Sequence, residues 1–217
     1  DAVVLSHAHI DHCGRLPLLR KRGFRGPIYA TPACRDLARI LLADSAFMAE
    51  REAERYRRKQ AEHGNRHARG FPDPLFTRVD ADETLQQFKP VPYGRATEVL
   101  PGVTLRFRDA GHILGSAIVE VWVGEGARRR KIVFSGDLGQ PARPLLRDPT
   151  HIHDADYLVV ESTYGNRDHK SMEATQDELV EAINDTIERK GGNVIIPAFA
   201  VGRTQDILYL LADLTRQ

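Results

Sequence analysis

Three histidines and one aspartate lie close together near the start of the chain, in the run His7-Ala8-His9-Ile10-Asp11-His12. Imidazole nitrogens and carboxylate oxygens are ligands that zinc takes in proteins. In an extended strand, residues i and i+2 face the same side, so His7 and His9 are placed to grip one ion. A helix that starts after them turns Asp11 and His12 toward a second ion. Asp11 is also a suitable helix cap, but so dense a cluster has no packing purpose, which favours a metal centre.

This run resembles the metal-binding signature His-x-His-x-Asp-His of the metallo-β-lactamase superfamily. Two later segments resemble further metal motifs of that superfamily. Residues 110–116 contain His112, and residues 134–139 contain Asp137 after an apolar run and a glycine turn. Alone, each residue would be typical of an ordinary turn. In this order after the first cluster, His112 and Asp137 are predicted metal ligands.

A further carboxylate narrows the resemblance. Glu161 opens the sequence Glu-Ser-Thr-Tyr-Gly directly after the apolar run 157–160. By itself it would be a solvated strand end, but after Asp137 it looks like motif A of the β-CASP branch. Residues 194–205 resemble the strand, loop and helix that open the cap domain of that branch. The chain is therefore identified as β-CASP-like, similar to ribonuclease J and to the endonuclease that cleaves pre-messenger RNA.

The resemblance implies an α/β fold in which a metallo-β-lactamase αββα sandwich, with its N-terminal strands missing, precedes the start of an α/β cap. The implied domains are a partial catalytic domain, residues 1–165, and a partial β-CASP cap, residues 166–217. The chain begins inside a predicted strand and stops in a helical pattern, so we expect a fragment truncated at both ends. The later cap histidines and the last metal histidine of the family have no counterpart in this sequence.

The resemblance also implies an activity. We expect a zinc-dependent phosphodiester hydrolase, an endo- or exoribonuclease of RNA processing, that works through a metal-activated hydroxide. The implied ligands of two zinc ions are His7, His9 and His112 for the first, Asp11 and His12 for the second, and Asp137 as the bridge.

Other residues have implied roles around the metals. Asp11 also orients the hydroxide, and Glu161 orients a cap histidine that protonates the leaving oxygen. Ser116 and Arg203 are predicted to bind phosphate, Arg203 with help from a helix N-terminus, although a surface salt bridge explains Arg203 equally well. Single-stranded RNA is the predicted partner, while DNA as a substrate and the oligomeric state stay open.

Two other functions fit parts of the pattern. A small-molecule hydrolase of the same superfamily, such as a lactamase or thioester hydrolase, is disfavoured by the Glu161 motif and by the start of a cap. A non-catalytic scaffold of an RNA-processing complex, of the kind that has lost metal ligands, is disfavoured because every ligand expected in this part of the chain is present.

Hydrophobic periodicity predicts the elements that must position these residues. The predicted strands are 1–5, 28–30, 103–107, 117–123, 131–134, 157–160 and 193–197. The predicted helices are 11–22, 32–61, 80–88, 172–190 and 203–214. In the second helix, Leu37, Ile40, Leu41 and Phe47 or Met48 recur at helical spacing, and Asp80-x-x-Glu83 reads as a capping box for the third.

Composition sets outer limits. The 217 residues, 41% of them hydrophobic, suffice for one substantial core or one domain plus part of another. A net charge of +1 argues neither for nor against a nucleic-acid partner. Cys13 and Cys34 do not suggest a disulfide framework, and Cys13 is predicted to be buried. No apolar run approaches the roughly 18 residues of a membrane span and no signal peptide is visible, so a cytoplasmic location is predicted.

Overall fold

The computed structural model describes residues 1–62, 73–168 and 170–216. Two compact units divide the chain, Asp1–Glu161 and Ser162–Gln217. The predicted domain boundary between residues 165 and 166 stays a prediction.

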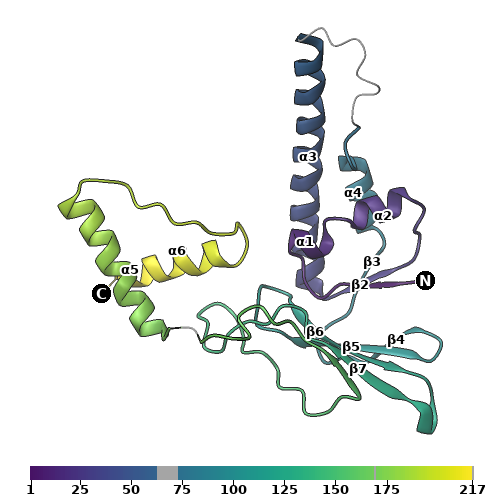
Figure 1. The fold of residues 1–217 in the computed structure, drawn as a ribbon. Coiled ribbons are helices and arrows are strands. Elements are labelled where there is room, and N and C mark those ends of the chain that lie inside the picture. Colours follow the sequence, from purple (N-terminus) through teal and green to yellow (C-terminus); the bar gives the residue numbers. More distant parts are fainter. Residues whose placement is uncertain (63–72, 169, 217) are drawn as a thin grey trace. The chain divides into compact units, whose positions relative to one another are not determined.

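Sheet A of the first unit has three parallel strands in the order β1 (Val3–Val4), β2 (Ile28–Ala30) and β3 (Phe88–Pro90). Parallel strands need crossover connections, which helices usually supply. Here the crossovers contain α1 (Ile10–Cys13), α2 (Leu16–Lys21), α3 (Pro32–Glu62) and α4 (Arg78–Leu85). Figure 1 shows these helices on one side of sheet A and the second sheet on the other.

Two predicted helices have different bounds in the structure. The single helix predicted over residues 11–22 is divided into α1 and α2, because Pro17 lacks an N–H and starts a new helix after a break at Gly14 and Arg15. The helix predicted to begin at Asp80 begins at Arg78 instead. Thr77 is its cap: the Thr77 hydroxyl accepts from Asp80 N, and the Asp80 carboxylate accepts from Thr77 N at 2.8 Å.

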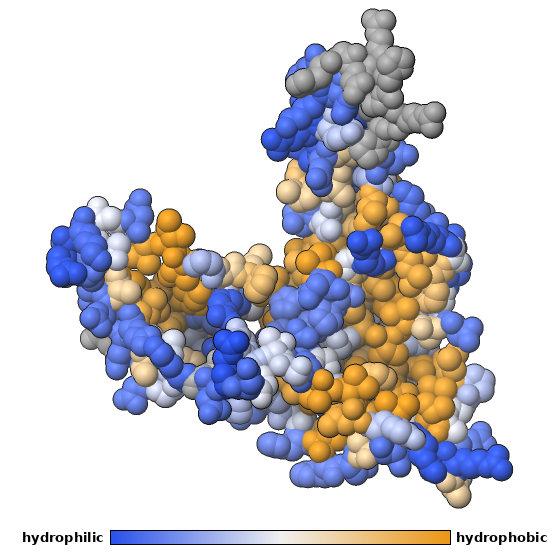
Figure 2. All heavy atoms as spheres, in the orientation of Figure 1, coloured by the Kyte–Doolittle hydropathy of each residue, from blue (hydrophilic) through white to orange (hydrophobic). Residues whose placement is uncertain are grey.

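Helix α3 packs through a narrower stripe than its hydrophobic pattern suggests. Its fully buried side chains recur every four residues. They are Cys34, Ala38, Leu42 and Ala46. Ile40, which was predicted to face inward, is 61% exposed, and Phe47 and Met48 are exposed as well. The helix instead packs through the side that carries Ala38 and Ala46, because these small side chains allow close contact with the neighbouring elements. On the face shown in Figure 2, the C-terminal part of α3 is hydrophilic and hydrophobic residues gather around its base.

Sheet B has five strands in the order β4 (Thr97–Leu100), β5 (Val103–Asp109), β6 (Ala117–Val123), β7 (Arg130–Phe134) and β8 (Tyr157–Val159). Neighbours are antiparallel except β7 and β8, which are parallel. A short 3-10 turn, η1 (Gly126–Arg128), connects β6 to β7. The predicted strands 103–107, 117–123 and 131–134 are present with small shifts, and β4 was not predicted.

Two hydrophobic clusters hold the layers together. One lies between the helices and sheet A and includes Leu5, Ile28, Leu42 and Phe88. The other lies between the two sheets and is built from Val91, Leu105, Phe107, Ala117 and Val119, with Tyr29 of sheet A packed against it. Both cysteines are buried as thiols, and burial raises the pKa of each to about 12.

The outer face of sheet B carries a buried ionic network. Glu120, which is 1% exposed, accepts hydrogen bonds of 2.6 and 3.1 Å from the Arg106 guanidinium, and Lys131 Nζ lies 2.7 Å from Glu120 Oε1. Lys131 also donates to Asp154 at 2.9 Å. Burial alone would raise the pKa of the Glu120 carboxyl, but the hydrogen bonds from Arg106 and Lys131 outweigh burial and lower it. Each charge of the network therefore has a partner.

The second unit contains α5 (Met172–Asn184), which continues as a π-helical turn, η2 (Asp185–Arg189), and α6 (Arg203–Leu214). The predicted strand 193–197 is wrong: residues 191–199 form no regular element, and Ile195 is 87% exposed. A strand needs a partner, and the described part of this unit has no strand to pair with it. Across the described residues, no helix is long and apolar enough to cross a membrane.

The ionic network gives a stability prediction. Glu120→Ala removes the carboxylate that pairs with both Arg106 and Lys131, and it leaves the largely buried Lys131 with only Asp154 as a counter-charge. We expect the free energy of unfolding to fall by about 3 kcal/mol in chemical denaturation, the lower end of the range for a broken buried ion pair. Because the folded-state pKa of Glu120 is lowered, this stabilisation is present at neutral pH and is lost as the pH falls through that pKa.

The matched control is Glu125→Ala, an exposed carboxylate near the β6–β7 turn, which should change the free energy of unfolding by about 0.5 kcal/mol or less. If the two alanine variants proved equally stable, the network would make no net contribution.

Candidate metal centre

The predicted ligands come from segments that follow strands of both sheets. His7 and His9 follow β1, His112 follows β5, and Asp137 follows β7. Strands β5 and β7 run in the same direction, because each is antiparallel to β6. The Ala117 N–H donates to the Ser6 carbonyl at 2.8 Å, which joins the end of β1 to the start of β6. The carboxyl ends of these strands therefore meet at one edge of the sandwich.

A first group of donor atoms has the spacing of a tetrahedral metal site. One donor atom from each of His7, His9, His112 and Asp137 lies within 4.8 Å of all the others. Asp137 Oδ2 lies 3.7 Å from His7 Nε2 and 3.6 Å from His112 Nε2, and His112 Nε2 lies 3.1 Å from His9 Nδ1. Donors bound at about 2.0–2.2 Å to tetrahedral zinc are about 3.3–3.6 Å apart. The three separations given above, 3.1–3.7 Å, are close to this range.

A second group shares the same aspartate. His12 Nε2 lies 3.4 Å from Asp137 Oδ1 and 3.5 Å from Asp11 Oδ2. The two Asp137 oxygens thus face different donor sets, with Oδ2 toward the first group and Oδ1 toward His12. A carboxylate in this position can bridge two cations. The Asp11 side chain is 75% exposed, so the second group opens to solvent.

The surroundings of His7 and His112 favour the neutral form of the ring, which is the form that binds a metal. Burial, together with His12, His112 and His9, lowers the pKa of His7 to about 3. Burial is also the largest cause of the lowered pKa of His112. His7 Nε2 is buried and makes no hydrogen bond within the described part of the chain, while Nδ1 lies 3.1 Å from Ser6 Oγ. A buried nitrogen without a partner is costly unless something binds it, and these donors fit a divalent metal.

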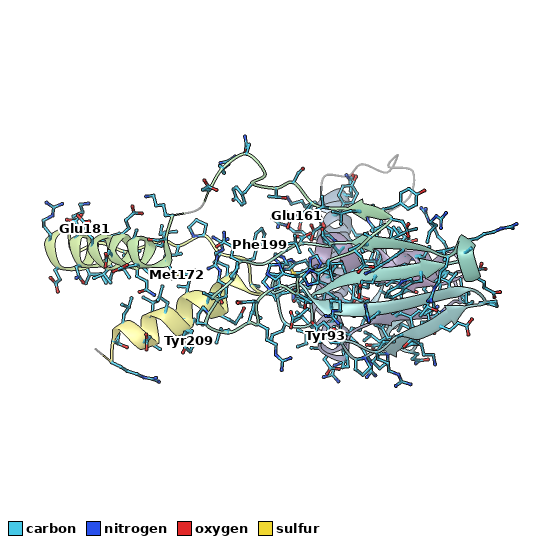
Figure 3. The ribbon with its side chains drawn as sticks, turned by 90° about the horizontal axis from the view of Figure 1, so that it is seen from below. Tyr93, Glu161, Met172, Glu181, Phe199 and Tyr209 are labelled. Atoms are coloured by element: carbon cyan, nitrogen blue, oxygen red, sulfur yellow. The ribbon has the colours of Figure 1, made fainter. Side chains whose placement is uncertain are left out.

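Glu161 lies beside the cluster of candidate donor residues but is not one of them. It follows β8, and its N–H donates to Ser135 Oγ at 3.1 Å. Its Oε1 accepts a hydrogen bond from Leu138 N at 2.6 Å, so the carboxylate is bound to the backbone of the residue directly after Asp137. Figure 3 shows Glu161 and Tyr93 at the same end of sheet B. Sequence reasoning had missed Ser135, although it stands in the same Phe-Ser-Gly-Asp motif as Asp137.

Of the two residues predicted to bind phosphate, Ser116 is buried and Arg203 is exposed. Ser116 is fully buried, and its Oγ accepts from His112 N at 3.0 Å and Ile113 N at 3.2 Å. A buried hydroxyl has no surface to offer a phosphate, so the structure corrects this assignment and gives Ser116 a role inside the His112 loop. Arg203 is exposed as the first residue of α6, in the second unit, and its phosphate contact stays a prediction.

Comparisons with known proteins agree on one family. Residues 1–191 match the family model described as a beta-lactamase superfamily domain. Ribonuclease TTHA0252 of Thermus thermophilus is 40% identical over 211 residues, which cover 97% of this chain and 42% of the relative. Two proteins called transcription termination factor FttA, from Pyrococcus horikoshii and Methanosarcina mazei, are 37% and 35% identical and match 100% of this chain. The chain spans 31% of each of these factors.

Proposed function

Because the chain belongs to the β-CASP branch of the metallo-β-lactamase superfamily, we propose that it forms the metal-binding part of a zinc-dependent phosphodiester hydrolase that cleaves RNA. The observation that carries the proposal is the position of Asp137, whose two oxygens face two separate donor groups. The ribonuclease among the relatives favours RNA as the substrate.

The donor chemistry favours zinc. Four imidazoles contribute to the two groups, whereas magnesium and calcium prefer sites made of oxygen atoms. His7, His9 and His112 would hold one ion, Asp11 and His12 the other, with Asp137 between them. When bound, such a metal pair lowers the pKa of water and offsets negative charge on phosphate oxygens.

The chain's own residues have distinct tasks around the substrate. Asp11 is exposed beside His12, where its carboxylate can orient an incoming water molecule and accept its proton. Glu161 keeps the Asp137 loop in place through Leu138 N and presents a charge next to His112. In the full-length protein, this charge is available to orient a proton donor from the cap. Exposed Arg203 is available for the RNA backbone.

The donor set also weighs against the scaffold function. A scaffold that has lost its metals has no need of a buried, neutral His7 with an unbonded ring nitrogen. The termination factors among the relatives are compatible with RNA cleavage during transcription termination, which makes nascent RNA a second substrate to assay.

Asp137→Asn in the full-length protein tests the bridge. The amide keeps the shape of the side chain but loses the charge that separates two cations. Loss of a residue that only hydrogen-bonds to a metal ligand lowers metal affinity or activity by about 10–100-fold, so loss of the bridging ligand itself should lower RNA cleavage by roughly 100-fold or more. Initial rates on one single-stranded RNA and on DNA of the same sequence measure this effect and the substrate preference together.

The control for that assay is Asp36→Asn, an exposed aspartate on α3, which should cleave at the unmodified rate. Unchanged cleavage by metal-loaded Asp137→Asn protein would refute the bridging role.

A pair of histidine variants tests how the donors are divided. His12 faces only Oδ1 of Asp137, so His12→Ala should lower the metal content from two ions to one per chain. His9→Ala should instead weaken the group that contains His7 and His112. Elemental analysis after dialysis against a weak chelator measures both. Retention of two tightly bound ions by both variants would contradict the assignment.

Glu161→Gln separates an orienting role from a ligand role. Glutamine still offers an oxygen to Leu138 N, so the loop should persist while the charge is lost. We expect RNA cleavage to fall by roughly 100-fold, as for removal of a general acid–base group, with unchanged metal content. Loss of metal in this variant would mean that Glu161 is itself a ligand.

A further inference from the structure

The loop that carries His112, residues 110–116, is tied to the N-terminus of helix α3. Thr31, the residue before α3, is fully buried. Its hydroxyl accepts from Cys34 N at 3.1 Å, as a helix cap does, and donates to the Gly115 carbonyl at 2.7 Å. One hydroxyl therefore fixes the first turn of the helix and the far side of the ligand loop at once.

The backbones of the loop and the helix also touch. Gly115 has φ +80°, and a Cβ added there would lie 2.2 Å from Cys34 N. Only glycine allows this conformation and this approach. The close contact prevents the loop from shifting toward the helix, while the Thr31 hydrogen bond prevents it from moving away.

A second side chain holds the next residue of the loop. The Tyr93 hydroxyl, from the segment between β3 and β4, donates to the Ser116 carbonyl at 2.7 Å. Ser116 in turn accepts from the His112 N–H through its own hydroxyl, at 3.0 Å. Two adjacent carbonyls, of Gly115 and Ser116, are thus bound from outside the loop, and the bond network ends on the backbone of His112.

We infer that Thr31 and Tyr93 are positioning residues for His112, and that the start of α3 sets the geometry of the metal centre. The inference rests on the proposed function in one respect, that His112 binds a metal. Neither side chain belongs to the donor cluster, so both act only through the loop. The direction of the His112 ring depends on the backbone at residue 112, which these two hydroxyls restrain.

The test uses cobalt(II) as a spectroscopic substitute for zinc in the full-length protein. Thr31→Val keeps the side-chain shape and removes the hydroxyl, whereas Thr31→Ser keeps the hydroxyl. We expect the valine variant to bind Co²⁺ about 10–100-fold more weakly and with an altered visible spectrum, and the serine variant to restore both. Tyr93→Phe, at a side chain 37% exposed, should act in the same direction if the valine variant fails to fold.

The matched control is Leu42→Ala, a fully buried residue of the same helix outside the loop network. It should lower the melting temperature without changing the Co²⁺ spectrum. A valine variant that melts earlier but keeps the unmodified affinity and spectrum would overturn the inference. If the unmodified protein bound Co²⁺ but did not cleave RNA, the proposed function alone would fail. If it bound no Co²⁺, both would fail.

Discussion

The metal centre depends on one carboxylate, that of Asp137, placed among four imidazoles. Four histidine rings pack with centroids 4.1–5.1 Å apart. Charged rings would repel at that distance, and the lowered pKa values of His7 and His112 show that the fold holds these two neutral. Their lone pairs and the Asp137 oxygens then converge on the same small volume. Such a concentration of electron density suits a positive charge, which a bound cation would supply.

The fold brings these donors together through close contacts between the loops at the strand ends, and not through long strands. Sheet A strands are only two or three residues long, yet Leu5 and Ile28 are almost completely buried. Close backbone contacts bring the loops together. A Cβ on Gly139 would lie 1.6 Å from the Gly111 carbonyl, so the loops that carry His112 and Asp137 meet where no side chain fits. Glycine at this point allows the loops of His112 and Asp137 to lie close enough for their donor atoms to converge.

Features that depend on residues close together in the sequence could be predicted from it. The ordered motifs identified the family, and the strands that precede His7, His112 and Asp137 follow from apolar runs. The errors have a common cause. The strand at 193–197 requires a pairing partner, and the buried position of Ser116 depends on how its loop folds back. The Thr31 hydroxyl caps α3 through the nearby Cys34 N, but its bond to Gly115 spans 84 residues and leaves no local trace in the sequence.

The first unit contains two buried polar networks, one around Glu120 and one around Asp137, and they differ in whether the protein itself satisfies every polar group. Around Glu120, each charge has its partner, so the network is complete within the protein and needs nothing further. Around Asp137, His7 Nε2 is buried without a hydrogen bond, and Asp137 Oδ2 lies 3.7 Å from it, beyond hydrogen-bonding distance. Folding alone does not favour such an arrangement, because an unsatisfied buried group costs about 1–3 kcal/mol. The unsatisfied His7 nitrogen in a well-packed sandwich is therefore better explained by the binding of an ion than by a contribution to stability. Whether every buried polar group has a partner within the protein thus distinguishes the ionic network from the metal centre.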